Sequence, residues 1–194
     1  MLIKTTLAAI FILFSHSVNA REQVIIRHNA YVVTGSTLQE IDRSIRKGGF
    51  HVSENGSFAA KTDYAINWQP IMENTDSGCL LKDVYITIEI EYSLPALAGY
   101  NKLSDLDKES WSKYYKALKA HEERHGYYAI EAARQFKWQA GEVFSAQNCD
   151  NIRRSLRKMA GRIFARYNEM NIAFDRRSNH GHKDGAYLLA SISK

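Results

Sequence analysis

Cysteine and proline are scarce in this chain of 194 residues, which contains two of each. Cys79 and Cys149 lie far apart and no C-x-x-C pair occurs, so the cysteine spacing of structural zinc modules is absent. Beyond residue 20, no apolar run is long enough to cross a bilayer, and repeats and low-complexity segments are missing. The formal net charge is a modest +5, and no DNA- or RNA-binding motif is present. These absences argue against a membrane-spanning protein, a repeat protein and a nucleic-acid binder.

The first twenty residues have the pattern of a secretory signal peptide. Lys4 supplies a positive charge, Leu7–Phe14 form a short apolar run, and Val18-Asn19-Ala20 have the small residues of a cleavage site. We expect cleavage after Ala20, with an uncleaved anchor as the alternative, and a single mature domain of residues 21–194. Such a protein is periplasmic or secreted and has no transmembrane segment after cleavage.

Export changes what the two cysteines are expected to do. An oxidising compartment favours pairing of an even number of cysteines, so Cys79 and Cys149 are predicted to form a disulfide. The bridge would close a loop of about 70 residues, for which the chain-entropy model gives a stabilisation of about 4 kcal/mol.

Apolar spacing changes along the chain from a period of two to a period of three or four. The clearest strand is 84–91, where apolar and polar residues alternate, as they do in an antiparallel sheet with one buried face. The predicted elements are, in order, a strand at 23–33, a short helix capped by Thr37 and ended by Gly48-Gly49, a strand at 58–68 ended by Pro70, the strand at 84–91, a long helix capped by Ser104, a second helix from about Asp150, and a loop-like tail at 174–194. The expected class is therefore α+β, with an N-terminal antiparallel sheet and one short helix followed by two long helices around one core.

The first long helix contains His121-Glu122-Glu123-Arg124-His125, which has the form H-E-x-x-H. Residues four apart lie one helical turn above each other, so the two imidazoles can bind one zinc ion. Apolar neighbours share their spacing and turn the pair toward the core. Two buried core histidines would fit that pattern as well, but burying the carboxylate of Glu122 beside them is costly. The motif predicts a catalytic zinc site with three protein ligands and one open position.

This motif and four further segments resemble a known family. The motif follows W-x-x-Y-Y-x-x-L at 111–118, the tail has N-H-G-x-x-x-G-A at 179–186, and T-G-S-T-L-x-E-I at 34–41 and A-x-T-x-Y-x-I-x-W at 60–68 also fit. The combination resembles the predicted secreted zinc-dependent proteases of Gram-negative bacteria, a domain-of-unknown-function family with an H-E-x-x-H motif. The resemblance covers residues 23–186 and implies a zincin-like metallopeptidase.

The third zinc ligand does not follow from the motif. Four residues are candidates, in the order His180, His182, Glu131 and Glu142. His180 comes first because Gly181 follows it and because it lies in the tail segment that matches the family.

The leading hypothesis is an exported metallopeptidase that hydrolyses peptide bonds through a zinc-activated water. His121, His125 and His180 would hold the zinc, and Glu122 would take a proton from the water and pass it to the leaving amine. Three residues are candidates for contacting the oxyanion or the substrate: His182, Tyr187 and Tyr167.

Two other functions stay open at this point. One is a non-catalytic exported module that contains zinc and binds an anionic envelope component through the basic helix face at 153–166. The other is a zinc amidase that acts on cell-wall peptide. In the leading hypothesis the partner is a peptide or protein substrate, and no nucleic acid is expected.

Overall fold

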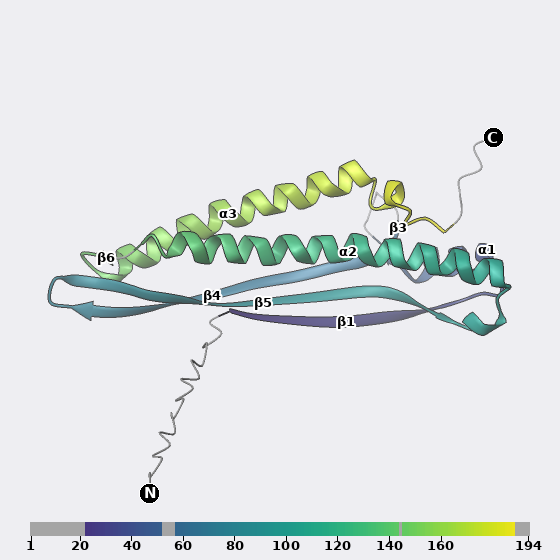
Figure 1. Cartoon of the computed structure of the whole chain (residues 1–194), viewed down its shortest axis with the longest axis horizontal. Helices are drawn as coiled ribbons and strands as arrows, with labels where there is room; N and C mark the ends of the chain where they lie inside the picture. Colours follow the sequence, from purple (N-terminus) through teal and green to yellow (C-terminus); the bar gives the residue numbers. More distant parts are fainter. Residues whose placement is uncertain (1–21, 52–56, 144, 189–194) are drawn as a thin grey trace, which may run out of the picture.

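The structure is a computed structural model that describes residues 22–51, 57–143 and 145–188. The predicted signal peptide lies outside these residues. In chain order the elements are β1 (Glu22–Thr34), α1 (Leu38–Gly48), β2 (Phe50–His51), β3 (Ser57–Phe58), β4 (Lys61–Thr75), β5 (Gly78–Ala98), the 3-10 helix η2 (Tyr100–Lys102), α2 (Asp105–Ala140), β6 (Ser145–Ala146), α3 (Cys149–Ser178) and the 3-10 helix η3 (His182–Asp184). Figure 1 shows an elongated molecule in which α2 runs along a long, narrow sheet.

β5 is the central strand of the main sheet, whose order is β1-β5-β4. β4 and β5 form a long antiparallel hairpin, but β1 runs parallel to β5 from Glu22 beside Ile86 to Thr34 beside Ala98. The sheet is therefore mixed, and the prediction of an antiparallel sheet is wrong for β1. Alternation in β5 reports which face is buried, and it carries no information on the direction of the neighbouring strand.

The sequence predicted that Pro70 would end β4, and that prediction is wrong. The strand continues to Thr75, and Pro70 pairs with Val84 just before a bulge at Ile71 and Met72. β4 lies at the edge of the main sheet, where the missing N–H of a proline can face away from the ladder.

α2 and α3 lie on the same side of the main sheet (Figure 1). Ile86, Ile88 and Ile90 of β5 are at most 1% exposed, and Phe136 of α2 is fully buried in the same cluster. The α+β class, the short helix and the two long helices thus agree with the sequence. Across the described residues, no helix combines the length and apolarity needed to span a membrane.

Gly126 lets α2 lie close to β5 directly after His125. A Cβ at this position would collide with the hydroxyl of Tyr92 on β5. A larger residue here would push α2 away from the sheet, so the close approach fixes the depth at which the neighbouring histidines lie.

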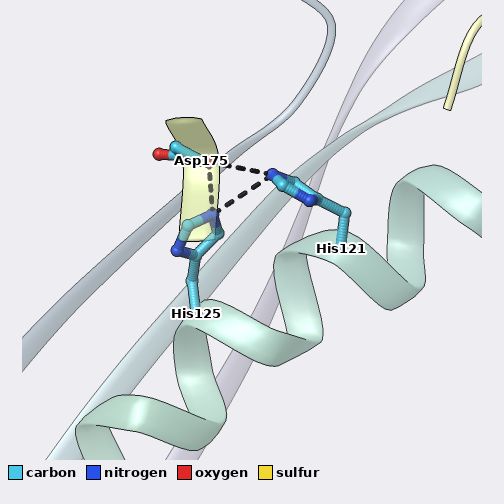
Figure 2. Close-up of side chains that lie close together, drawn as sticks. All are labelled: His121, His125 and Asp175. Atoms are coloured by element: carbon cyan, nitrogen blue, oxygen red, sulfur yellow. Dashed lines mark hydrogen bonds and ion pairs between the residues drawn. The ribbon is translucent and has the colours of Figure 1, made fainter. Parts of the chain in front are cut away.

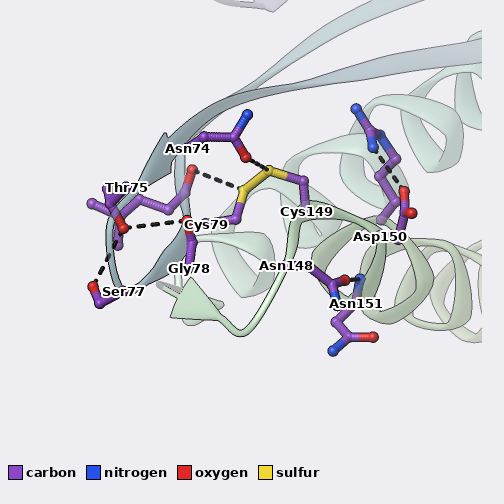
Figure 3. Close-up of a disulfide and its surroundings, with 11 residues drawn as sticks. Asn74, Thr75, Ser77, Gly78, Cys79, Asn148, Cys149, Asp150 and Asn151 are labelled. Carbon is purple, nitrogen blue, oxygen red and sulfur yellow. Dashed lines mark hydrogen bonds and ion pairs between the residues drawn. A yellow bond between two sulfur atoms is a disulfide. The ribbon is translucent and has the colours of Figure 1, made fainter.

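α3 is attached to the sheet at its first residue. Cys149 forms a disulfide with Cys79 of β5, which confirms the predicted bridge (Figure 3). Toward its C-terminal end α3 separates from α2 (Figure 1) and continues to Ser178, so the prediction of a loop-like tail is wrong for residues 174–178. Neither glycine nor proline interrupts 162–178, and Asn179 ends the helix in the left-handed conformation.

Candidate metal centre

α2 places His121, Glu122 and His125 at one position along the sheet. His121 and Glu122 are 5% and 6% exposed, and His125 is partly buried. The two imidazoles lie one turn apart and nearly perpendicular, with their Nε2 atoms 3.2 Å from each other. The four-residue spacing thus produces the convergence that the motif predicted.

Asp175, near the end of α3, is the third member of the cluster (Figure 2). Its Oδ1 lies 3.1 Å from Nε2 of His121 and 3.1 Å from Nε2 of His125. Within the described part of the chain, these three residues form the one group of at least three His, Cys, Asp or Glu side chains whose ligand atoms lie within 4.8 Å of one another.

The three atoms fit a zinc ion in both chemistry and spacing. Two imidazole nitrogens and one carboxylate oxygen are donors that zinc accepts at about 2.0–2.2 Å. Tetrahedral ligands at about 2.0–2.1 Å from a common centre lie about 3.3–3.4 Å apart. The observed separations of 3.1–3.2 Å are close to this value, so small movements of the side chains would complete the geometry.

Outer contacts orient one of the imidazoles. Nδ1 of His125 donates to Oδ1 of Asn171 at 2.8 Å, and Nδ2 of Asn171 donates to the hydroxyl of Tyr64 at 3.2 Å. With a proton held on Nδ1, Nε2 can give up the proton that it donates to Asp175 and offer its lone pair to a metal instead.

The other imidazole is held by packing. The ring of His121 stacks on Phe174 with 4.7 Å between the centroids, and a Cβ on Gly181 would lie 3.0 Å from its Cγ. Nδ1 of His121 is the single buried side-chain nitrogen or oxygen without a hydrogen-bond partner in the described regions. In these regions, no hydrogen bond at Nδ1 therefore opposes the tautomer of His121 that a metal at Nε2 would require.

Charge at the cluster favours a bound cation. Burial would raise the pKa of Asp175, but hydrogen bonds from His121 and His125 outweigh it and lower the pKa below the usual value. Burial would likewise lower the pKa of His125, yet hydrogen bonds to Asp175 and Asn171, with the nearby charge of Asp175, raise it. An ionised carboxylate that increases the proton affinity of a neighbouring imidazole is suited to binding another cation in the proton's place.

Glu122 points toward β4. Its Oε2 accepts a hydrogen bond from Oγ1 of Thr62 at 2.6 Å. Burial raises the pKa of Glu122, while the Thr62 bond and the charges of His125 and His121 act in the opposite direction.

A cavity of about 560 Å³ opens onto the cluster from between α2, α3, the start of β4 and the segment after α3. His121, Glu122, His125 and Asp175 all line it. The site is therefore accessible to a ligand much larger than water.

The structure brings some of the other predicted site residues to this cavity and leaves others away from it. His180 and His182 line it. Nδ1 of His180 lies 3.6 Å from Oδ1 of Asp175, but His180 is about half exposed and lies outside the three-residue group. Tyr187 stacks on His182, and Tyr167 lines a separate cavity of about 130 Å³.

The two carboxylates considered as third ligands are also placed elsewhere. Glu131 accepts a hydrogen bond from Arg134 on the same helix, and Glu142 is exposed just beyond the end of α2. Asp175, Asn171 and Thr62 were missed from the sequence, although the four-residue spacing of Asn171 and Asp175 matches that of the two histidines.

Fold and site together define an α+β protein with a histidine–carboxylate cluster between two long helices. The chain belongs to the family DUF922, described as a bacterial protein of unknown function, which matches residues 28–181. The matched region contains the cluster, Glu122 and His180, and ends before His182 and Tyr187. The comparisons with curated proteins and with solved structures gave no match.

Proposed function

We propose that the protein is an exported zinc-dependent peptidase. The observation that carries this proposal is the convergence of His121, His125 and Asp175 beside the buried carboxylate of Glu122, in an open cavity. A site with three protein ligands and room for another is typical of catalytic zinc.

His121, His125 and Asp175 would hold the ion, so Asp175 replaces His180 as the proposed third ligand. A bound zinc ion would polarise the substrate carbonyl and increase the acidity of a water molecule. His180 lies at the edge of the cavity beside Asp175, where it can contact substrate.

Glu122 is the proposed general base. Its carboxylate is buried, lines the cavity, and takes no part in the three-residue group. It accepts a proton from the attacking water and delivers that proton to the leaving amine, which keeps the proton balance of hydrolysis. A non-catalytic zinc site has no need of a buried carboxylate in this place.

The edge of β4 supports a polypeptide as substrate. Lys61 and Thr62 point to opposite faces of the strand, as neighbouring strand residues do, and both line the cavity. The cavity therefore reaches the strand edge. This edge has no partner strand in the described parts of the chain, so its backbone N–H and C=O groups can pair with an extended peptide.

Export is part of the proposal. It rests on the signal-like residues 1–20 of the sequence, and the Cys79–Cys149 disulfide supports it because such bridges persist in oxidising compartments.

Replacing the proposed base tests the function directly. Glu122→Gln keeps the shape of the side chain but cannot accept the proton, so hydrolysis of an unstructured protein such as casein should fall by about 10²–10⁴. Zinc content, measured by elemental analysis of the purified protein, should stay at the wild-type level. Glu123→Gln is the matched control, because Glu123 is half exposed and pairs with Lys119. A wild-type protein that takes up no zinc, or a fully active Glu122→Gln variant, would contradict the proposal.

A further inference from the structure

Thr62 donates a short hydrogen bond to Glu122 from outside α2. Its Oγ1 lies 2.6 Å from Oε2 of Glu122 and 3.1 Å from the backbone oxygen of the same residue. The two residues are 60 positions apart in the sequence and belong to different layers, since Thr62 is on β4 and Glu122 on α2. The contact therefore connects the sheet to the proposed base.

The hydroxyl of Thr62 constrains which carboxylate oxygen can act. A hydroxyl has one proton to donate, and the shorter contact directs it to Oε2. Hydrogen bonds to an ionised acceptor are the stronger kind, and this one opposes rotation of the carboxylate. Oε2 thus already accepts one hydrogen bond, whereas Oε1 accepts none among the described residues and is the oxygen better placed to take a proton.

The sheet holds Thr62 in place. Its backbone pairs with Tyr92 of β5 within a ladder that runs without a shift from Lys61 to Ile71. Tyr92 is also the residue whose hydroxyl faces Gly126 of α2. The same two strands therefore set both the depth of α2 and the position of the hydroxyl that meets Glu122.

We propose that Thr62 is a positioning residue for general-base catalysis, which holds Oε2 of Glu122 so that Oε1 faces the attacking water. This inference rests on the proposed peptidase function. Thr62 has no contact with His121, His125 or Asp175 among the hydrogen bonds of the described residues, so its role is separable from metal binding.

Thr62→Val and Thr62→Ser form the test pair. Valine keeps the branched shape and lacks the hydroxyl, whereas serine keeps the hydroxyl. We expect Thr62→Val to lower kcat by about 10- to 100-fold, less than loss of the base itself, with KM and zinc content unchanged. Thr62→Ser should recover most of the rate. Thr75→Val is the control, because Thr75 is on the same strand and its hydroxyl bonds to Gly78 far from the site.

A second measurement separates positioning from a general structural role. In a Glu122→Gln background, Thr62→Val should cause no further loss of kcat, because the group that it positions is already disabled. Independent, multiplicative losses would overturn the proposal, as would loss of zinc in Thr62→Val. If Thr62→Val fails to fold, Thr62→Ala is used in its place, because it also removes the hydroxyl.

The outcomes distinguish this inference from the function on which it rests. A zinc-dependent wild type with an unchanged kcat in Thr62→Val would overturn the role of Thr62 and leave the peptidase intact. A zinc-loaded wild type that hydrolyses no polypeptide would overturn both.

Discussion

The two ends of α3 are joined to the rest of the molecule by different chemistry. At the first residue, Cys149 is covalently bonded to Cys79 of β5 (Figure 3). Near the last turn, Asp175 is joined to His121 and His125 of α2 by polar contacts (Figure 2). The first link has no titrating group, whereas the second joins groups that titrate and, in the proposed function, hold a cation.

The surroundings of α3 differ in the same way. Its first half buries apolar side chains, with Ile152 and Leu156 fully buried. Its last turns bury the polar residues Asn171, which lines the cavity, and Ser178. Because the first end is held by apolar packing and a covalent bond, the other end can carry a polar, accessible cluster without being the main support of the fold.

Removing the disulfide is expected to have the largest effect on stability. The bridge closes a separation of 70 residues, so a Cys79→Ala, Cys149→Ala variant should lose about 4 kcal/mol of unfolding free energy in urea denaturation. Zinc content of the folded variant should match the wild type, because the other end of α3 has its own contacts. If zinc is lost along with stability, the two ends are coupled and the comparison fails.

The fold could be predicted as far as local patterns reach. Thr37 and Ser104 cap α1 and α2 as their sequence positions indicated, and alternation located β5. The direction of β1 could not be predicted in this way. It depends on the path through α1 and the β2–β3 pair, which brings the chain back so that β5 lies between β1 and β4.

The same limit applies to the site. His121 and His125 are neighbours on one helix, so their spacing predicts that they meet. Asp175 is 50 residues beyond His125, and its position depends on α3 staying helical past Phe174 and passing over α2. Thr62 reaches Glu122 across 60 residues and leaves no local pattern at all.

Replacing the proposed ligand on α3 tests the other end of the comparison. Asp175→Asn keeps the shape and removes the charge that faces both imidazoles. Loss of a residue that only supports a metal ligand costs up to about 100-fold in affinity, so loss of this proposed ligand should lower zinc affinity by at least about 100-fold. His180→Ala should change affinity far less, because His180 lies outside the three-residue group. Competition with a fluorescent zinc chelator measures both. The reverse order would restore His180 as the third ligand.

The smallest expected effect concerns how the unfolding free energy of the metal-free protein depends on pH. The contacts at the C-terminal end of α3 should make it vary with pH, whereas the disulfide at the other end should not. The pKa of His125 in the folded protein is raised above the ordinary 6.5. Its contribution to the free energy of unfolding is therefore fully present below pH 6.5 and is lost as pH rises through the folded pKa. Asp175 has a folded pKa below the ordinary 3.8, so its contribution is present above pH 3.8 and is lost as pH falls. Together they stabilise the metal-free protein most between about pH 4 and 6.5.

Urea denaturation of chelator-treated protein at several pH values measures this effect. Above pH 6.5 the unfolding free energy should fall with pH, by at most about 1.4 kcal/mol per unit for one proton. The raised pKa of Glu122 adds a loss of the same sign from pH 4.5 upward, so the Glu122→Gln background isolates His125. Asp175→Asn should flatten the remaining slope, because Asp175 is a main cause of the raised pKa of His125.

Zinc should reverse the sign of this pH dependence, since the ion binds neutral imidazole and stabilises the folded protein more as pH rises. The disulfide has no titrating group, so its removal should lower every curve by the same amount and leave the slopes unchanged. Equal slopes with and without zinc would show that the cation does not bind at His125.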